Sequence, residues 1–126
     1  MMRSFFYSIV VCLLSFSAYG QNVTTPKKIS VSKLERKLKK DIQLVDVRTE
    51  KEFKEQHLDK AININVEDAD FEKSIQALDK AKPVYVYCRS GKRSDKAAQK
   101  MASMGFTKIY DLKGGILSWN AKQAKN

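Results

Sequence analysis

The sequence predicts an α/β layered domain with a mainly parallel sheet, and two observations favour this class. Short runs rich in Val, Ile and Tyr alternate along the chain with segments whose apolar residues have helical spacing. The chain has 126 residues, and removing a signal-like segment of 20 leaves 126 − 20 = 106 residues. This length is enough for one hydrophobic core and too short for two domains. Strands and helices that alternate in this way typically form a parallel sheet covered by helices.

The individual elements follow from caps and periodicity. Ser32 is a suitable N-cap for a first helix that carries Leu34 and Leu38 on one face. Thr49 can cap a second helix, in which Glu52 occupies the third position, as in a capping box. The predicted strands cover residues 42–47, 61–64, 83–87 and 107–112, and the predicted helices after the first cover residues 50–56, 67–78, 94–104 and 116–123.

Glycines mark two of the predicted boundaries. Gly105 follows the helix predicted at 94–104 and suits the left-handed conformation that ends many helices. Gly114 and Gly115 are predicted to form the turn between the last strand and the last helix.

The first 20 residues are predicted to be a cleaved secretory signal, followed by a polar linker at 21–28 and the domain at 29–126. Arg3 precedes an apolar run at 4–16, and Ala18 and Gly20 supply the small residues that precede a cleavage site. The apolar run is shorter than the roughly 20 residues that a transmembrane helix needs, so we expect no stable membrane anchor. We therefore expect an exported protein in the periplasm, with secretion into the medium as the alternative.

The positive charge of the chain restricts its partners. The formal net charge is +10, and it falls to +9 when Arg3 leaves with the signal. A surplus of this size can indicate nucleic acid or acidic membranes. The lysines are scattered along predicted helices without interleaved aromatic residues, and export argues against nucleic acid. We expect a monomer without a nucleic-acid partner, in which some of the charge attracts small anions.

The mature chain would keep a single cysteine, because Cys12 lies in the signal and Cys88 in the domain. A lone cysteine in an exported protein cannot form a disulfide within its own fold. Cys88 is therefore predicted to be either a reactive thiol or a bonding partner for another molecule.

The segment around Cys88 favours the reactive thiol. Cys88 follows the apolar run 84–87 and begins a short basic loop that opens the helix predicted at 94–104. Backbone N–H groups and the positive end of a helix stabilise an anion at such a place. They also favour the thiolate, which is the reactive form of cysteine. In parallel sheets, ligands bind beyond the carboxyl ends of the strands, where this loop would lie.

Four segments in order give the chain a resemblance to the single-domain rhodaneses, a family of sulfurtransferases. The resemblance extends from about residue 29 to residue 121 and implies a three-layer domain with a central sheet of about five strands. The segments are Leu44–Arg48, then Glu52–Phe53 with His57–Leu58 and Ala61–Ile64, then Tyr87–Ser94, and finally Lys113–Gly115 with Trp119. The chain departs from the family pattern at Gln56 and Lys60, where glycines are usual. We expect these two changes to alter a loop away from the cysteine.

The resemblance implies a two-step sulfur relay without a metal or an organic cofactor. The thiolate of Cys88 would take the outer sulfur of a small anionic donor such as thiosulfate, leaving a persulfide on the cysteine. A thiol, cyanide or a protein thiol would then accept that sulfur. Splitting one transfer into two covalent steps is a general route to faster chemistry.

The resemblance also implies roles around the nucleophile Cys88. The loop residues would bind the donor and the persulfide, with Ser94 as either a hydrogen-bond donor to the sulfur or the helix N-cap. Arg48 could reach the substrate, or could form an ion pair with Asp46 that supports neighbouring loops. His57 is expected to tie its own loop by hydrogen bonds. The loop residues concerned are Arg89, Ser90, Gly91, Lys92, Arg93 and Ser94.

Two alternatives to a sulfurtransferase remain open at this point. A phosphatase or arsenate reductase of the same fold would also use a cysteine in an anion-binding loop. Those phosphatases have five residues between the cysteine and the arginine, whereas four separate Cys88 from Arg93. The second alternative is a module that carries sulfur to a partner or binds it without turnover, because fold alone does not establish activity.

Overall fold

The computed structural model describes residues 24–126, and the predicted signal at 1–20 lies outside them. Five parallel strands form one sheet in the order β1-β5-β4-β2-β3. The α/β class and the parallel sheet are therefore confirmed. In chain order the elements are β1 (Lys27–Ile29), α1 (Val31–Lys37), β2 (Gln43–Asp46), α2 (Glu50–Glu55), β3 (Ile62–Asn63), α3 (Phe71–Ile75), β4 (Val84–Tyr87), α4 (Lys92–Ser103), β5 (Ile109–Leu112) and α5 (Gly115–Gln123).

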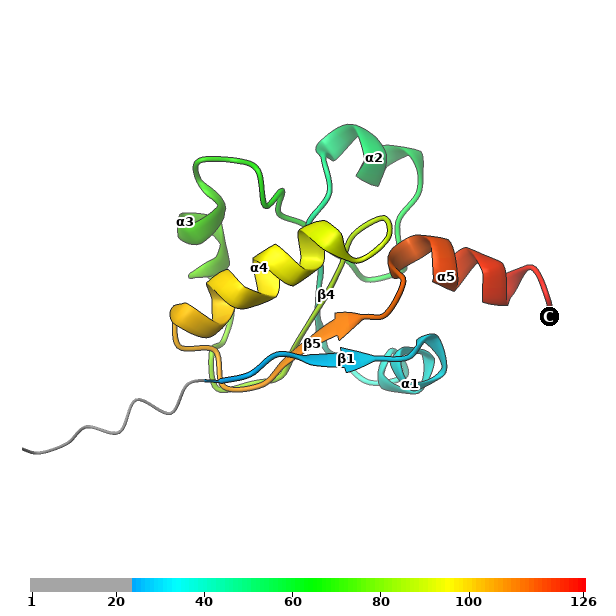
Figure 1. Cartoon of the computed structure of the whole chain (residues 1–126), viewed down its shortest axis with the longest axis horizontal. Helices are drawn as coiled ribbons and strands as arrows, with labels where there is room; N and C mark the ends of the chain where they lie inside the picture. The colour runs from blue at the N-terminus through cyan, green and yellow to red at the C-terminus, as the bar shows by residue number, and fades with distance from the viewer. Residues whose placement is uncertain (1–23) are drawn as a thin grey trace, which may run out of the picture.

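The sheet separates two hydrophobic cores, which gives the three layers expected (Figure 1). Helices α3 and α4 pack on one face, and helices α1 and α5 pack on the other. Along β4 the side chains alternate between the faces, as they must in a strand. Val84 and Val86 join the α3–α4 core, whereas Tyr85 and Tyr87 join the α1–α5 core.

Strand β1 was not among the predicted strands, and it begins inside the segment assigned to a linker at 21–28. Lys27 and Lys28 are exposed and only Ile29 is buried, so the three residues carry no alternating pattern. The strand is held by parallel pairing with β5, in which Lys28 lies opposite Asp111. An edge strand of this kind is defined by its backbone partner rather than by its own side chains.

Helices α1 and α3 differ from what the sequence predicts. Ser30, not Ser32, is the N-cap of α1, and its Oγ accepts a hydrogen bond from the Lys33 N–H at 3.2 Å. The helix predicted at 67–78 is reduced to Phe71–Ile75. Its apolar spacing continues to Leu78 because that residue still packs on the core after the helix has ended.

Helix α4 begins at Lys92, two residues before the predicted start. Its N-cap is Gly91, whose φ of +119° is a conformation that side chains rarely adopt. The interpretation of Ser94 as the N-cap is therefore wrong. At its other end, Gly105 has a φ of +97°, as a left-handed stop requires.

The two departures from the family pattern have different structural consequences. Gln56 has extended backbone angles (φ −165°, ψ 139°), so glycine is not needed there. Lys60 has a φ of +68° and is the one non-glycine residue with positive φ between residues 24 and 126. Its Nζ donates to the Leu38 carbonyl at 3.1 Å, which ties the strained loop to the end of α1.

Within residues 24–126, no helix combines the length and the apolar character that crossing a membrane requires.

Candidate functional site

Cys88 lies immediately beyond β4, on the α3–α4 side of the sheet. Its side chain is 1% exposed and packs in the same core as Val84 and Val86. Cys88 is a free thiol. The sulfur is therefore held rigidly at the carboxyl edge of a central strand, where a parallel sheet presents its ligands.

The loop after Cys88 curves so that one backbone amide points at the sulfur. The Gly91 N–H donates to Sγ at 3.1 Å. The thiol lies 3.4 Å from the Ser94 hydroxyl, which itself donates to the Gly91 carbonyl at 3.1 Å. Ser94 is fully buried and so has a fixed place beside the sulfur. That Ser94 donates to the ionised sulfur remains a prediction, because its hydrogen bond now goes to the loop backbone.

Helix α5 sets the direction of the loop carbonyls. The amides of Ile116 and Leu117, in its first turn, donate to the carbonyls of Cys88 and Arg89 at 2.9 and 3.1 Å. These bonds satisfy N–H groups that a helix start leaves free. By holding these two carbonyls, α5 helps to fix the path of the loop that brings the Gly91 N–H to the sulfur.

Gly115 makes this contact between loop and helix possible. A Cβ at this position would lie 2.4 Å from the Arg89 carbonyl oxygen and 2.6 Å from that of Cys88. Its φ of +60° is also unfavourable for any side chain. Glycine is therefore required here by the close approach of two backbones.

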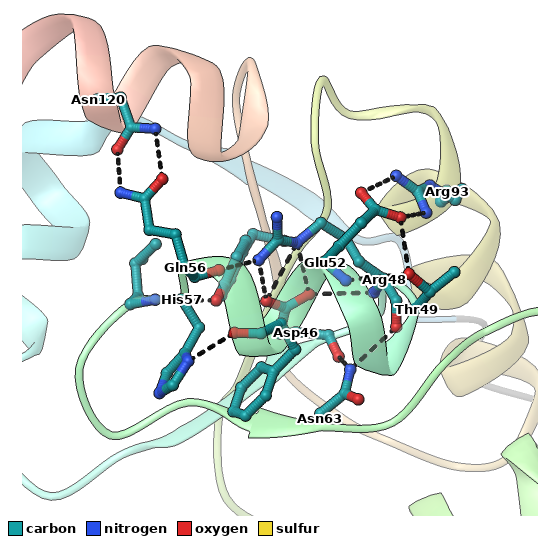
Figure 2. A network of polar contacts seen from close by, with 12 residues as sticks. Asp46, Arg48, Thr49, Glu52, Gln56, His57, Asn63, Arg93 and Asn120 are labelled. Carbon is teal, nitrogen blue, oxygen red and sulfur yellow. Dashed lines mark hydrogen bonds and ion pairs between the residues drawn. The ribbon is translucent and has the colours of Figure 1, made fainter.

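Arg93, one of the three predicted loop cations, is already paired with a carboxylate. Its Nη1 and Nη2 donate to the two oxygens of Glu52 at 2.7 and 2.9 Å (Figure 2). The hydrogen bonds from Arg93 lower the pKa of Glu52 to about 2, and the charge of Arg93 and a bond from Thr49 act in the same direction. Thr49 is the N-cap of α2, as predicted, so this pair joins the start of α2 to the first turn of α4.

The other two loop cations are free to meet a ligand. Arg89 and Lys92 are exposed, and neither forms an ion pair with another residue of the described chain. Ser90 is exposed between them and Gly91. Arg89 and Lys92 are therefore the two loop cations that remain available to an anionic ligand.

Asp46 and Arg48 form an ion pair on the opposite side of the sheet from the thiol. Asp46 lies in register with Tyr87, so its side chain points to the α1–α5 face, whereas Cys88 belongs to the other. Arg48 Nη2 lies 2.6 Å from an Asp46 oxygen, and Nε lies 2.9 and 3.1 Å from the two oxygens. Both residues are buried. The ion pair that was one of the two roles considered for Arg48 is thus present, and its binding of substrate stays a prediction.

The remaining bonds of this network are all internal. Arg48 also donates to the Gln56 carbonyl at 2.6 Å and lies over the Tyr87 ring at 5.7 Å. Asn63 donates to the carbonyls of Asp46 and Arg48 at 3.0 and 2.9 Å (Figure 2). Burial alone would lower the pKa of Arg48, but hydrogen bonds and the charge of Asp46 outweigh it and leave the pKa raised. The guanidinium thus stays charged, with Nε and Nη2 bonded within the protein and Nη1 without a partner in the described chain (Figure 2).

His57 contacts its own loop. Its Nδ1 lies 2.8 Å from the Phe53 carbonyl, and its ring stacks on Phe53 with centroids 3.8 Å apart. Beside it, the amides of Gln56 and Asn120 exchange two hydrogen bonds, of 2.8 and 3.0 Å, which connect this loop to α5 (Figure 2).

Sequence reasoning missed the supporting roles of three residues. Glu52 was identified only as part of a cap, yet it also binds Arg93, 41 residues away. Tyr87 was only part of an apolar run, yet its hydroxyl accepts from the Leu58 N–H at 3.0 Å. Gly115 was assigned only to a turn. The roles of Glu52 and Tyr87 depend on tertiary pairing, so no local sequence pattern indicates them. For Gly115, the adjacent glycine pair is a signal that can indicate a close approach of two backbones.

No metal centre is formed by the described residues, since no three His, Cys, Asp or Glu side chains among them converge.

Comparison with known proteins agrees with this arrangement. The family described as "Rhodanese-like domain" matches residues 30–122. The chain is 36% identical to "Thiosulfate sulfurtransferase GlpE" of Coxiella burnetii over 83 residues, which are 66% of this chain and 76% of that protein. It is also 36% identical to the protein of the same name from Shewanella oneidensis over 100 residues, or 78% and 96% of the two chains. The crystal structure of a rhodanese-like domain protein from Staphylococcus aureus superposes with a TM-score of 0.67 at 27% identity, covering 74% of this chain and 90% of that one.

Proposed function

Because the chain belongs to the rhodanese-like domain family, we propose that it is a sulfurtransferase that carries sulfane sulfur on Cys88. The observation that carries this proposal is the amide of Gly91, which points at the buried sulfur from 3.1 Å. A backbone donor and the start of α4 both stabilise negative charge at this place. The same features would hold a persulfide anion after the first transfer.

The proposed reaction has two displacements at sulfur. The Cys88 thiolate attacks the outer sulfur of thiosulfate, and the bond between the two thiosulfate sulfurs breaks. Sulfite leaves with the electron pair, and a persulfide remains on the cysteine. An acceptor then attacks the outer sulfur of that persulfide, and the cysteine leaves again as thiolate. The first step only needs the thiol proton to pass to solvent beforehand, so no general base takes part.

The free cations explain why an anionic donor would be used. Thiosulfate carries two negative charges, and Arg89 and Lys92 are exposed without an ionic partner in the described part of the chain. Positive side chains beside a thiolate both attract the donor and offset the charge that builds up when two anions meet. Arg93 contributes less to this attraction because Glu52 neutralises it.

The ion pair of Arg93 also argues against the phosphatase alternative. A phosphatase of this kind would need its loop arginine to hold a tetrahedral oxyanion by two hydrogen bonds. Here the guanidinium already donates two bonds to Glu52, and the loop has one residue fewer than in those phosphatases. The geometry therefore favours transfer of a single sulfur atom.

We also propose that the protein works after export, in the periplasm or outside the cell. The signal pattern at residues 1–20 supports this location. Fractionation of the source cells, followed by the mass of the protein in each fraction, tests it. A protein that keeps residues 1–20 and stays in the cytosol would contradict it.

Intact mass spectrometry tests the sulfurtransferase proposal directly. The reduced protein is incubated with thiosulfate, and a Cys88→Ser variant is treated in parallel. A gain of one sulfur that cyanide removes, absent from the variant, is the expected result. A folded wild-type protein that gains no sulfur from thiosulfate would reject the donor proposed here, and sulfur on the variant would reject the role of Cys88.

A further inference from the structure

An apolar side chain stands exposed beside the mouth of the Cys88 loop. Leu117 is 44% exposed and is one of two large apolar side chains with such exposure in residues 24–126, the other being Ile62. Its backbone N–H donates to the Arg89 carbonyl at 3.1 Å, so it lies directly against the loop. In Figure 1 the start of α5 lies next to the loop between β4 and α4.

Three exposed cations belong to the segments that meet beside Leu117. Arg89 and Lys92 belong to the loop, and Lys113 follows the end of β5. Asp111 lies in register with Val86, so Lys113, two residues further on, is level with Cys88. All three cations are exposed, and none forms an ion pair with a described residue. We refer to Arg89, Lys92, Lys113 and Leu117 as the mouth surface.

The carboxylates near the mouth surface are already occupied. Glu52 binds Arg93, and Asp95 in the first turn of α4 lies 3.5 Å from Lys28. Asp111 is buried and binds Lys28 as well. The charge of the mouth surface is therefore not compensated from within this part of the domain.

A small donor does not account for the whole mouth surface. Thiosulfate is a compact, strongly hydrated dianion, and an exposed leucine offers it no favourable contact. Lys113 lies outside the loop that would bind such a donor. An exposed apolar side chain with unpaired cationic side chains near it is more typical of a surface where another macromolecule docks.

We propose that the sulfur acceptor is a cysteine thiol in an acidic protein segment that docks on the mouth surface. Its carboxylates would face the three cations, and an apolar side chain would cover Leu117. This inference rests on the proposed function for its chemical step. In that step the acceptor thiolate attacks the outer sulfur of the Cys88 persulfide, the sulfur–sulfur bond breaks, and the electron pair returns to Cys88 as thiolate. The acceptor leaves as a persulfide, and no oxidant or reductant is needed.

A binding experiment tests the docking without any sulfur transfer. Two fluorescent peptides carry one cysteine and one leucine and differ only in flanking glutamates or lysines. Their affinity for the Cys88→Ser protein is measured by fluorescence anisotropy. The glutamate peptide is expected to bind about 10-fold more tightly at low salt, because opposite charges attract over this range. Lys113→Glu and Leu117→Gln should each weaken it several-fold, while the control variants Lys108→Glu and Ile62→Gln should not.

Lys108 and Ile62 are matched controls because they reproduce the same changes elsewhere. Lys108 is exposed near the opposite end of β5, and Ile62 is equally exposed on the edge strand β3. Equal affinity for the two peptides would overturn the proposal. So would equal losses in the mouth-surface and control variants, or binding to vesicles of anionic phospholipid that depends on Leu117 without any preference between the peptides.

A transfer experiment separates the docking proposal from the proposed function. The wild-type protein is loaded with thiosulfate, freed of donor, and mixed with each peptide or with cyanide. Leu117→Gln should slow transfer to the glutamate peptide several-fold and leave loading and transfer to cyanide unchanged. A protein that does not load rejects the proposed donor, whereas a protein that loads and transfers equally to both peptides rejects the docking surface.

Discussion

Two charged regions flank the carboxyl edge of the same sheet, and they use their charge in opposite ways. In the Asp46–Arg48 network the two charges neutralise each other and bond to neighbouring backbone carbonyls, and both residues are at most 5% exposed. In the loop after Cys88, the cations Arg89 and Lys92 point into solvent without an ionic partner in the described chain. The comparison indicates that charge close to a reactive group is not by itself a sign of ligand binding. What matters is whether the charge is already neutralised.

The largest effect is expected when the network loses one partner. Asp46→Ala leaves the guanidinium of Arg48 buried without its carboxylate, which we expect to lower the free energy of unfolding by about 3–5 kcal/mol. Urea denaturation of the wild type, Asp46→Ala and Asp46→Asn measures the loss. The sulfur-loading rate per folded molecule should change little. A stable Asp46→Ala protein that no longer loads sulfur would place the network in the active site. The network and the loop cations would then not differ in function.

Gly115→Ala should damage the loop region by a steric route. The added Cβ meets the Arg89 carbonyl and adopts an unfavourable φ, which we expect to lower the free energy of unfolding by about 2–3 kcal/mol. Because the same carbonyls orient the loop, sulfur loading per folded molecule should fall as well. Thermal unfolding and loading kinetics check both effects. The control is Ala121→Gly, an exposed position later in α5, and equal stability of Gly115→Ala and wild type would show that the loop tolerates movement of α5.

Removal of the free cations should affect donor use without affecting stability. The double variant Arg89→Gln, Lys92→Gln is expected to raise the KM for thiosulfate about 10-fold and to leave the midpoint of urea denaturation unchanged. High salt should reduce the difference between the double variant and the wild type. The matched control is Lys82→Gln with Lys108→Gln, two exposed cations away from the loop. An unchanged KM in the loop variant would mean that its cations have no part in binding the donor.

The smallest effect concerns the ion pair that lies between the two regions. Its side chains are 27% exposed, so Glu52–Arg93 should stabilise the fold by no more than about 1 kcal/mol after solvent screening. The pKa of Glu52 falls from an ordinary 4.5 to about 2 on folding. The stabilisation is therefore fully present above pH 4.5 and is lost as the pH falls toward 2. Glu52→Gln should flatten this part of the stability profile, and a profile identical to the wild type would show that the pair is unimportant for stability.

Features encoded locally could be predicted, and features created by distant pairing could not. The cap at Thr49, the stop at Gly105 and the place of Cys88 after an apolar strand depend on adjacent residues, and the structure agrees with each. The strand at Lys27–Ile29 exists only because β5 pairs with it, so its own residues gave no signal.

The site shows the same division. The sequence predicts that Cys88 begins a tight loop, because a glycine and basic residues come after it. The ion pair between Glu52 and Arg93 depends on the tertiary placement of α2 and α4. No spacing in the sequence predicts this pair. The ion pair of Arg48 likewise depends on strand register, which places Asp46 on the face opposite the thiol.

The pairing of β1 with β5 has a consequence for the order in which the domain assembles. Lys28 and Asp111 are 83 residues apart in the chain, yet they lie side by side at the edge of the sheet. During synthesis β1 therefore has no strand to pair with until β5 has been made. Contacts between such distant residues slow folding, because the chain between them loses entropy before the contact forms. Lys28 also contacts Asp95 at the start of α4, so the helix that follows the Cys88 loop gains this contact only when the two ends of the domain meet.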